Sequence, residues 1–156
     1  MITLEFDECF SAFHNKVDAY DFLDFEDYEI EELEIEWLRA ACSDPYVRRL
    51  FSSFEFDDED EEVINFEMRY SVDDDFDSDF IKNILATGMA INWLTPKVNS
   101  LISINQVFGS KEESFFSQQQ HMKEVRALRD SWIKEQRKSI RDRGAYFNSY
   151  IAGYED

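Results

Sequence analysis

Apolar side chains recur at steps of three and four in two N-terminal stretches, which is the spacing of one helix face. The first stretch predicts a short helix over residues 5–17, with apolar positions at Phe6, Phe10, Phe13 and Val17. In the second, Asp24 or Asp27 can cap a helix whose end is set by Pro45, which either stops it or opens a final turn. The apolar positions of that second helix are Ile30, Leu33, Trp37, Ala40 and Ala41.

A third stretch, residues 79–94, is apolar over most of the helical circumference. Such a helix is typical of the middle of a bundle. Gly88 weakens it by about 1 kcal/mol relative to alanine, which suggests that a neighbouring helix approaches closely there. Pro96 is expected to end the helix, because proline disrupts a helix interior. A short helix over residues 101–107 and a turn at Phe108–Ser110 are expected to follow.

The last predicted helix is the longest and has two distinct faces. It covers residues 118–143, about 39 Å at 1.5 Å per residue, with Ser117 as its N-cap and Gly144 as the left-handed residue that ends it. One face is apolar and contains Met122, Val125, Leu128, Trp132, Ile133 and Ile140. The other, which we call the basic stripe, is interrupted only by Asp130 and contains Lys123, Arg126, Lys134, Arg137, Lys138 and Arg141.

The hydrophobic period changes to two in the middle of the chain. Apolar residues alternate with polar ones on both sides of the acidic run at residues 57–62, and alternation predicts strands. The run itself cannot pack in a core, so we expect a solvated turn. These features predict a β-hairpin over Phe54–Val72, within an acidic insertion of about residues 52–78 that leans on the helices or on a neighbouring subunit.

Together these elements predict one mainly α domain over residues 1–156. We expect a small helical bundle with a long C-terminal helix and one inserted acidic β-hairpin. A chain of 156 residues has the length of one ordinary domain and can bury about two-thirds of its unfolded surface. Only four glycines and two prolines are present, which argues against a many-turned β fold.

The charge of the chain excludes some functions. Its 16 basic and 35 acidic residues give a net charge of −19. A protein that binds nucleic-acid phosphates over its whole surface needs the opposite sign. The imbalance is uneven, because residues 1–117 carry 8 basic and 29 acidic side chains whereas residues 118–156 carry 8 and 6. The two parts therefore have net charges of −21 and +2.

Motifs that carry chemistry are sparse. His14 and His121 belong to no metal-binding or catalytic pattern, and no glycine-rich phosphate loop is present. Cys9 and Cys42 form no disulfide framework and are expected to act as small hydrophobes. No apolar run approaches the 18 residues of a membrane span, and the acidic N-terminus lacks a secretory pattern. We therefore expect no enzyme activity, no cofactor, no metal and no membrane association.

Residues 73–79 are a candidate calcium site. Alternate aspartates have the oxygen spacing that opens an EF-hand loop, at Asp73, Asp75, Asp77 and Asp79. However, Ser78 stands where that loop needs glycine, and Ile84 stands where it needs a bidentate glutamate. We favour the alternative of an acidic helix start, because carboxylates stabilise the positive end of a helix.

Three features in order give the C-terminal half a resemblance to a known family. The first is an apolar helix closed by Trp93-Leu94-x-Pro96-Lys97, and the second is an aromatic turn that ends in Phe115-Phe116-Ser117. The third is a long basic helix of the pattern L-R-x-x-W/Y-x-x-E-x-R-x-x-I-R over Leu128–Arg141. Over Ile84–Ile151 the chain resembles the head–tail adaptor (connector) proteins of tailed bacteriophages, and most of all those of crAss-like phages.

The resemblance implies a structural protein of the virion neck that is assembled in the host cytoplasm and has no catalytic residues. Subunits of that family form a ring, twelve-membered by the family's stoichiometry, which binds the phage portal protein. The ring extends the channel for DNA ejection and joins further tail or ring proteins. The family's C-terminal segment anchors to the portal, which corresponds here to Gly144–Asp156. The candidate portal contacts in the anchoring tail, residues 145–156, are Tyr146, Phe147, Tyr150 and Ile151.

The charge pattern is compatible with such a ring. Head-to-tail contacts join two dissimilar surfaces, so the basic stripe is a candidate contact with acids of the adjacent subunit or of the portal. Its alternative is a solvated basic face. An acidic lumen would also let genomic DNA pass without specific binding, because it repels phosphates. Two other functions remain open: an acidic DNA mimic that inhibits a host nucleic-acid enzyme, and a chaperone or scaffold outside the virion.

Overall fold

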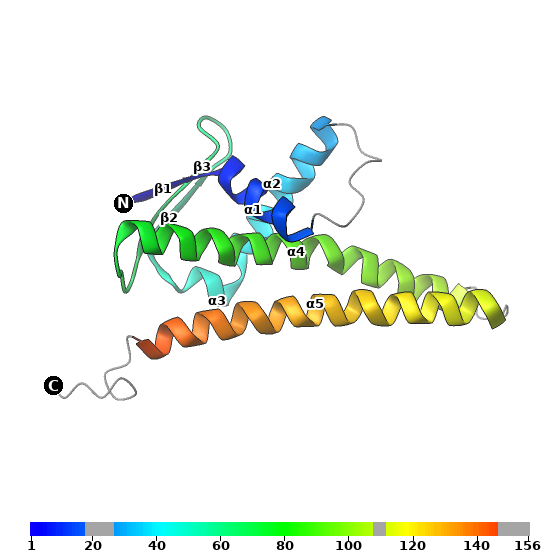
Figure 1. The fold of residues 1–156 in the computed structure, drawn as a ribbon. Helices are drawn as coiled ribbons and strands as arrows, with labels where there is room; N and C mark the ends of the chain where they lie inside the picture. Colours follow the sequence, from blue (N-terminus) through cyan, green and yellow to red (C-terminus); the bar gives the residue numbers. More distant parts are fainter. Residues whose placement is uncertain (18–26, 108–111, 147–156) are drawn as a thin grey trace.

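The computed structural model describes residues 1–17, 27–107 and 112–146, with side chains described at 1–17, 30–99 and 119–145. Helices dominate these ranges, and the predicted mainly α class with a long C-terminal helix is confirmed (Figure 1). In chain order the elements are β1 (Ile2–Glu5), α1 (Phe6–Val17), α2 (Asp27–Ser43), α3 (Pro45–Arg48), β2 (Phe51–Asp57), β3 (Val63–Met68), α4 (Asp74–Val107) and α5 (Glu112–Tyr146).

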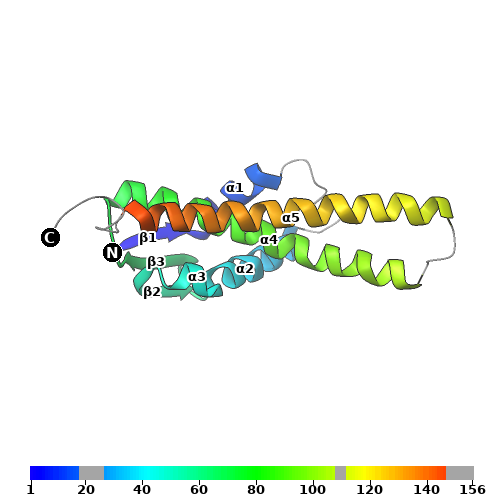
Figure 2. The ribbon, with the colours of Figure 1, turned by 90° about the horizontal axis from the view of Figure 1, so that it is seen from below.

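Helix α4 is the central element of the fold. Helix α5 runs antiparallel along one side of it, and α1 and α2 pack on the other side (Figure 1). The small sheet lies beside the N-terminal part of α4, at the same end as the C-terminus of α5. Beyond α1 and α2, the rest of α4 and the first part of α5 continue side by side as an arm (Figure 2). The molecule is therefore a compact body with one helical projection.

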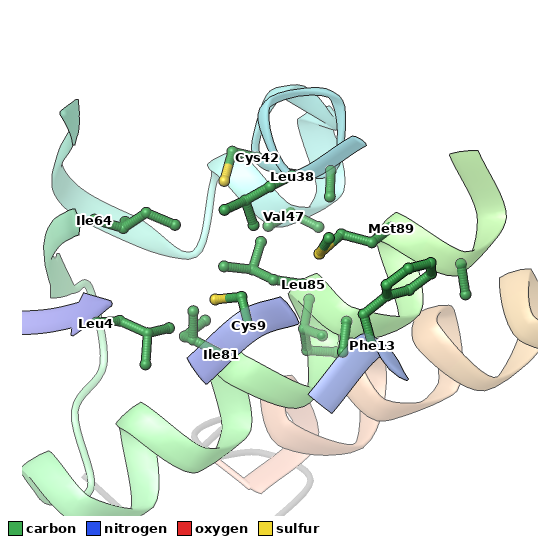
Figure 3. Packing of buried hydrophobic residues seen from close by; sticks show 14 of the residues in the cluster. Leu4, Cys9, Phe13, Leu38, Cys42, Val47, Ile64, Ile81, Leu85 and Met89 are labelled. Carbon is green, nitrogen blue, oxygen red and sulfur yellow. The ribbon is translucent and has the colours of Figure 1, made fainter. Parts of the chain in front are cut away.

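The core lies mainly between α4 on one side and α1, α2 and the sheet on the other (Figure 3). Each fully buried leucine, isoleucine or phenylalanine there contributes about 1.5–3 kcal/mol through removal of its surface from water. On the other side of α4, Trp132 and Ile140 of α5 are also buried. The side chains that Figure 3 labels at the centre of the cluster include Leu4, Phe13, Leu38, Val47, Ile64, Ile81, Leu85 and Met89.

Both cysteines belong to this core, as their prediction as small hydrophobes requires. Burial raises the pKa of Cys42 to about 12 and also raises the pKa of Cys9. The two thiols therefore stay protonated at neutral pH, and the thiolate that reacts with oxidants and alkylating agents is suppressed.

The prediction of a close helix approach at Gly88 is confirmed. A Cβ atom on Gly88 would lie 2.7 Å from Cβ of Ala41 on α2 and 3.2 Å from Nε2 of Gln136 on α5. The Gln136 side chain is itself buried and donates a hydrogen bond of 3.0 Å to the carbonyl oxygen of Ile84. Three helices thus meet at a position where only glycine fits.

Several predicted helix ends are wrong. Helix α4 continues through Pro96 to Val107, so residues 101–107 are not a separate helix. A proline costs a helix about 3 kcal/mol, and the packing of α4 along α5 outweighs that cost. Helix α5 begins at Glu112, so Ser117 is not its N-cap and the predicted aromatic turn is helical. It also continues past Gly144, which is not in the left-handed conformation.

Helix α2 begins at Asp27, which is the first helical residue and not the predicted cap. Asp24 and the predicted turn at 108–110 lie outside the described residues. Pro45 opens a final turn, α3, which Asp44 caps by accepting a hydrogen bond of 2.9 Å from the amide of Tyr46.

The predicted hairpin is confirmed, with strands at Phe51–Asp57 and Val63–Met68 in antiparallel pairing. Its register places Phe54 opposite Phe66 and Phe56 opposite Ile64. The hairpin is part of a three-stranded sheet in the order β1-β3-β2, because β1 pairs with the other edge of β3. The sequence prediction missed β1, since four residues are too short to show a period.

Candidate interface surfaces

The outer face of α5 carries the basic stripe. Trp132, Gln136 and Ile140 turn toward α4 and are buried, so residues on the opposite side of the helix point to solvent. Five of the six stripe residues are exposed and make no side-chain hydrogen bond or ion pair with another described residue: Lys123, Arg126, Lys134, Lys138 and Arg141. From Lys123 to Arg141 the stripe extends about 27 Å along the helix.

The sixth member, Arg137, has an internal role. Its guanidinium lies 3.6 Å from the centroid of the Tyr46 ring and 3.6 Å from the Asp44 carboxylate. Both partners belong to the turn that begins α3, so Arg137 fastens α5 to that turn. The sequence placed Arg137 in the stripe by helical angle, and only the three-dimensional structure separates it from its neighbours.

Arg143, near the end of α5, makes a buried contact that sequence reasoning missed. Its guanidinium lies 2.9 Å from the carboxylate of Asp77, and neither side chain is exposed beyond 7%. It also donates to the backbone carbonyl of Tyr70. Asp77 additionally accepts a hydrogen bond of 2.6 Å from the hydroxyl of Ser71. This network fixes the C-terminal end of α5 against the start of α4.

The same network bears on the calcium hypothesis. Asp77 points inward to Arg143, whereas Asp73 caps α4 by accepting a hydrogen bond of 2.8 Å from the amide of Phe76. Asp79 lies 3.4 Å from Lys82. Asp73, Asp77 and Asp79 thus have separate partners, and the segment begins a helix with Asp73 as its cap. Within the described ranges, no group of three or more histidine, cysteine, aspartate or glutamate side chains is placed to hold a metal ion.

The turn between β2 and β3 is an ordered acidic projection. The Asp57 carboxylate accepts hydrogen bonds from the amides of Glu59 and Asp60, at 3.3 and 3.0 Å. At the other end of the turn, the carbonyl oxygen of Glu62 accepts a hydrogen bond of 3.0 Å from the amide of Phe6. The backbone of Glu62 has a positive φ of 54°. Asp58 pairs with Arg39 of α2. The residues that remain exposed at the tip are Glu59, Asp60, Glu61 and Glu62.

One buried carboxylate lies between α1 and α2. Glu34 is 5% exposed and forms a short contact with Nε2 of His14, whose side chain is half exposed. Burial raises the pKa of Glu34, and the hydrogen bond to His14 partly offsets this shift. The pair joins two helices and has the geometry of a structural contact. The other histidine, His121, is exposed on α5.

Two grooves flank α5 at the level of Gln136. The larger, about 470 Å³, lies between α1, α4 and α5, and the ion pair of Lys16 with Glu135 lies in its wall at 3.2 Å. The smaller, about 360 Å³, is lined partly by Ala41 and Gly88. Neither groove has histidine or cysteine among the described residues that line it.

The candidate portal contacts fall at the edge of the structure. Tyr146 is the last residue of α5, and Phe147, Tyr150 and Ile151 lie outside the described residues. The end of the molecule where α5 terminates also contains exposed apolar side chains of the β3–α4 connection and the first turn of α4, namely Tyr70, Val72 and Phe76. No pattern in the sequence singles these three residues out.

Comparisons with known proteins identify no relative. No protein-family model matches the chain, and neither a curated protein nor a solved structure matches it. Among the helices in the described ranges, none has the length and apolar character needed to cross a membrane.

Proposed function

We propose that this protein is a structural component of the neck of a tailed bacteriophage, a portal-bound head–tail adaptor that forms a ring and extends the DNA channel. The observation that carries the proposal is the separation of charge on one subunit. An exposed basic stripe follows α5, and an acidic turn projects from the other side of α4 (Figure 1). The resemblance of residues 84–151 to the adaptor family adds support from the sequence.

The physical requirements of a ring favour this reading of the charges. A cyclic ring of identical subunits needs head-to-tail contacts, in which one surface meets a different surface of the next copy. Two oppositely charged surfaces on one chain meet that requirement. The strong negative net charge suits a DNA conduit, because every basic contact with phosphate would add affinity and slow passage.

The arrangement of the helices suits attachment to a larger partner. The ion pair of Arg143 and Asp77 holds the end of α5 against the body of the fold, so a tail that follows it would leave from a fixed point. Exposed Tyr70, Val72 and Phe76 lie at this end and would add apolar area to a portal contact. An aromatic anchoring tail at residues 145–156 is part of the proposal.

Virion proteomics tests the proposal against its alternatives. The adaptor should be present in purified virions, in roughly the same copy number as the portal protein, and should co-purify with portal when the two are expressed together. A DNA mimic would instead stay monomeric or dimeric, be absent from virions and inhibit a nucleic-acid enzyme in a purified assay. A chaperone or scaffold would be found in infected cells and not in finished particles.

A deletion tests the anchoring tail. Removal of residues 145–156 leaves Arg143 and its contact with Asp77 in place, so the truncated chain should remain folded. We expect it to lose binding to portal, because aromatic side chains dominate many interfaces. A truncated protein that co-purifies with portal at full yield would show that the tail is not the anchor.

A further inference from the structure

We propose that the basic stripe of α5 receives the acidic β2–β3 turn of a second copy of this chain. The contact joins Arg126, Lys134 and Lys138 of one subunit to carboxylates at Glu59–Glu62 of the next. The closure of such contacts into a ring rests on the proposed function, whereas the contact itself follows from the charges and placement described below.

Among the described side chains, cations without a described partner are concentrated on this one face. Outside the stripe, every cation whose side chain is described, except Arg69, has a carboxylate or an aromatic ring beside it: Lys16, Arg39, Arg48, Arg49, Lys82, Lys97, Arg129 and Arg143. In the stripe only Arg137 has such a partner. A chain with 35 acids could have neutralised these cations within one subunit.

The unpaired cations also oppose one another. Lys134 and Lys138 are four residues apart, a spacing that brings like charges together on a helix and weakens it. Lys138 and Arg141 are three apart and face the same way. A partner that supplies several carboxylates along this line relieves the repulsion, so the stripe is suited to an acidic segment.

The β2–β3 turn has the chemistry that such a partner needs. Four consecutive acids, Glu59–Glu62, are exposed at its tip and have no described base beside them. The turn is held by the Asp57 carboxylate, by the Glu62 carbonyl and by the ion pair of Asp58 with Arg39. A projection that is ordered before binding loses less conformational entropy when it docks.

The turn of one subunit lies away from the stripe of the same subunit. Figure 1 shows the turn on one side of α4 and α5 on the other. The partner is therefore another molecule, and because the two surfaces differ, each copy can bind one neighbour through its stripe and another through its turn. Complementary charge of this kind sets register and association rate more than affinity, and it weakens as salt rises.

Charge reversal on each side, followed by mixing, tests the contact. The stripe variant carries Arg126→Glu, Lys134→Glu and Lys138→Glu, and the turn variant carries Glu59→Lys, Asp60→Lys and Glu61→Lys. Arg137 is left intact because it holds α5 to α3. Self-association of the full-length chain is measured by sedimentation velocity at low and at high salt, and circular dichroism verifies that each variant is folded.

We expect each variant alone to associate at least about tenfold more weakly than wild type in low salt, since several ion pairs become repulsive. An equimolar mixture should recover association, because the basic turn of one variant meets the acidic stripe of the other and the remaining two surfaces are unchanged. The matched control carries Glu32→Lys, Glu36→Lys and Glu55→Lys, which changes net charge equally without touching the turn. This control should self-associate as wild type does, because its stripe and its turn are both intact.

Other results overturn the inference. It is wrong if both variants associate as strongly as wild type, or if mixing them does not restore association. It is also wrong if the wild-type chain stays monomeric at low salt. A stripe variant that self-associates normally but is no longer retained on a DNA duplex would assign the stripe to nucleic acid. Normal self-association of both variants with normal portal binding would refute this contact and leave the proposed function standing. If mixing restores association but the protein is absent from virions, the contact stands and the proposed function is refuted.

Discussion

Arg143 and Asp77 form an ion pair of 2.9 Å that is buried between the last turns of α5 and the start of α4. The two residues are 66 positions apart, and their ion pair joins α5 to α4 at the end of the molecule where the sheet also lies. Removing one partner of a buried pair leaves the other charge without compensation, which is more costly than removing both.

Arg143→Ala should therefore lower the free energy of unfolding by about 3–5 kcal/mol. Arg141→Ala is the matched control, because Arg141 is exposed and two residues away, and it should change stability by less than about 0.5 kcal/mol. Urea denaturation followed by circular dichroism measures both. Equal effects of the two substitutions would mean that the ion pair does not hold the end of the molecule.

Gly88→Ala should destabilise the protein although alanine is the better helix former. The intrinsic gain of about 1 kcal/mol is opposed by a contact of 2.7 Å with Ala41 and one of 3.2 Å with Gln136. Overpacking of this kind costs about 1–3 kcal/mol, and we expect a lower melting temperature.

Gly144→Ala is the control for this substitution. Gly144 is helical and has no atom within 4 Å of the added Cβ, so the change should stabilise α5 by about 0.5–1 kcal/mol. If both glycine variants were stabilised, the close meeting of α2, α4 and α5 would be disproved.

The buried carboxylate of Glu34 predicts a pH dependence. Its folded-state pKa is raised above the ordinary value of 4.5, so the folded state holds this proton more tightly than the unfolded state does. The resulting contribution to stability is fully present below pH 4.5 and is lost as the pH rises through the raised value. Glu34→Gln removes this dependence, so its stability relative to wild type should increase with pH.

Urea midpoints of the two proteins between pH 4 and pH 8 would measure the effect. The difference between variant and wild type should grow over the range that starts near 4.5 and extends to the raised pKa. A difference that stays constant over this range would show that burial does not control the titration of Glu34.

The core thiols predict slow labelling in the native state. Burial raises the pKa of Cys42 to about 12, and Cys9 is fully buried beside the same core residues. Iodoacetamide at pH 8 should label both cysteines at the rate of protein opening, and rapidly once urea unfolds the chain. Labelling of either cysteine at the rate of an exposed thiol would contradict the packing of α1 and α2.

The local pattern of apolar and polar residues predicts much of the fold but few of the contacts between residues far apart in the chain. The change of period around residues 57–62 predicted the hairpin, and Gly88 predicted the meeting of helices, because each signal lies within a few residues. Strand β1 has only four residues and gains its structure by pairing with β3. Helix α4 passes Pro96 because of its packing along α5, which no local rule includes.

The candidate interface shows the same limit. Helical angle placed Arg137 with its five neighbours, but Tyr46 and Asp44 hold it within the subunit. Arg143 gave no signal at all, because its partner Asp77 belongs to an acidic stretch in which every residue looks equally solvated. Contacts between residues far apart in the chain depend on the packing of α4 against α5 and are visible only in the structure.

Native mass spectrometry of the full-length protein mixed with the portal protein of the same virus tests the adaptor proposal most directly. The proposal predicts a complex that contains a closed ring of this chain, with a copy number matched to the portal, and that falls apart as salt rises. A protein that remains monomeric or dimeric beside an intact portal at every salt concentration would contradict the proposal.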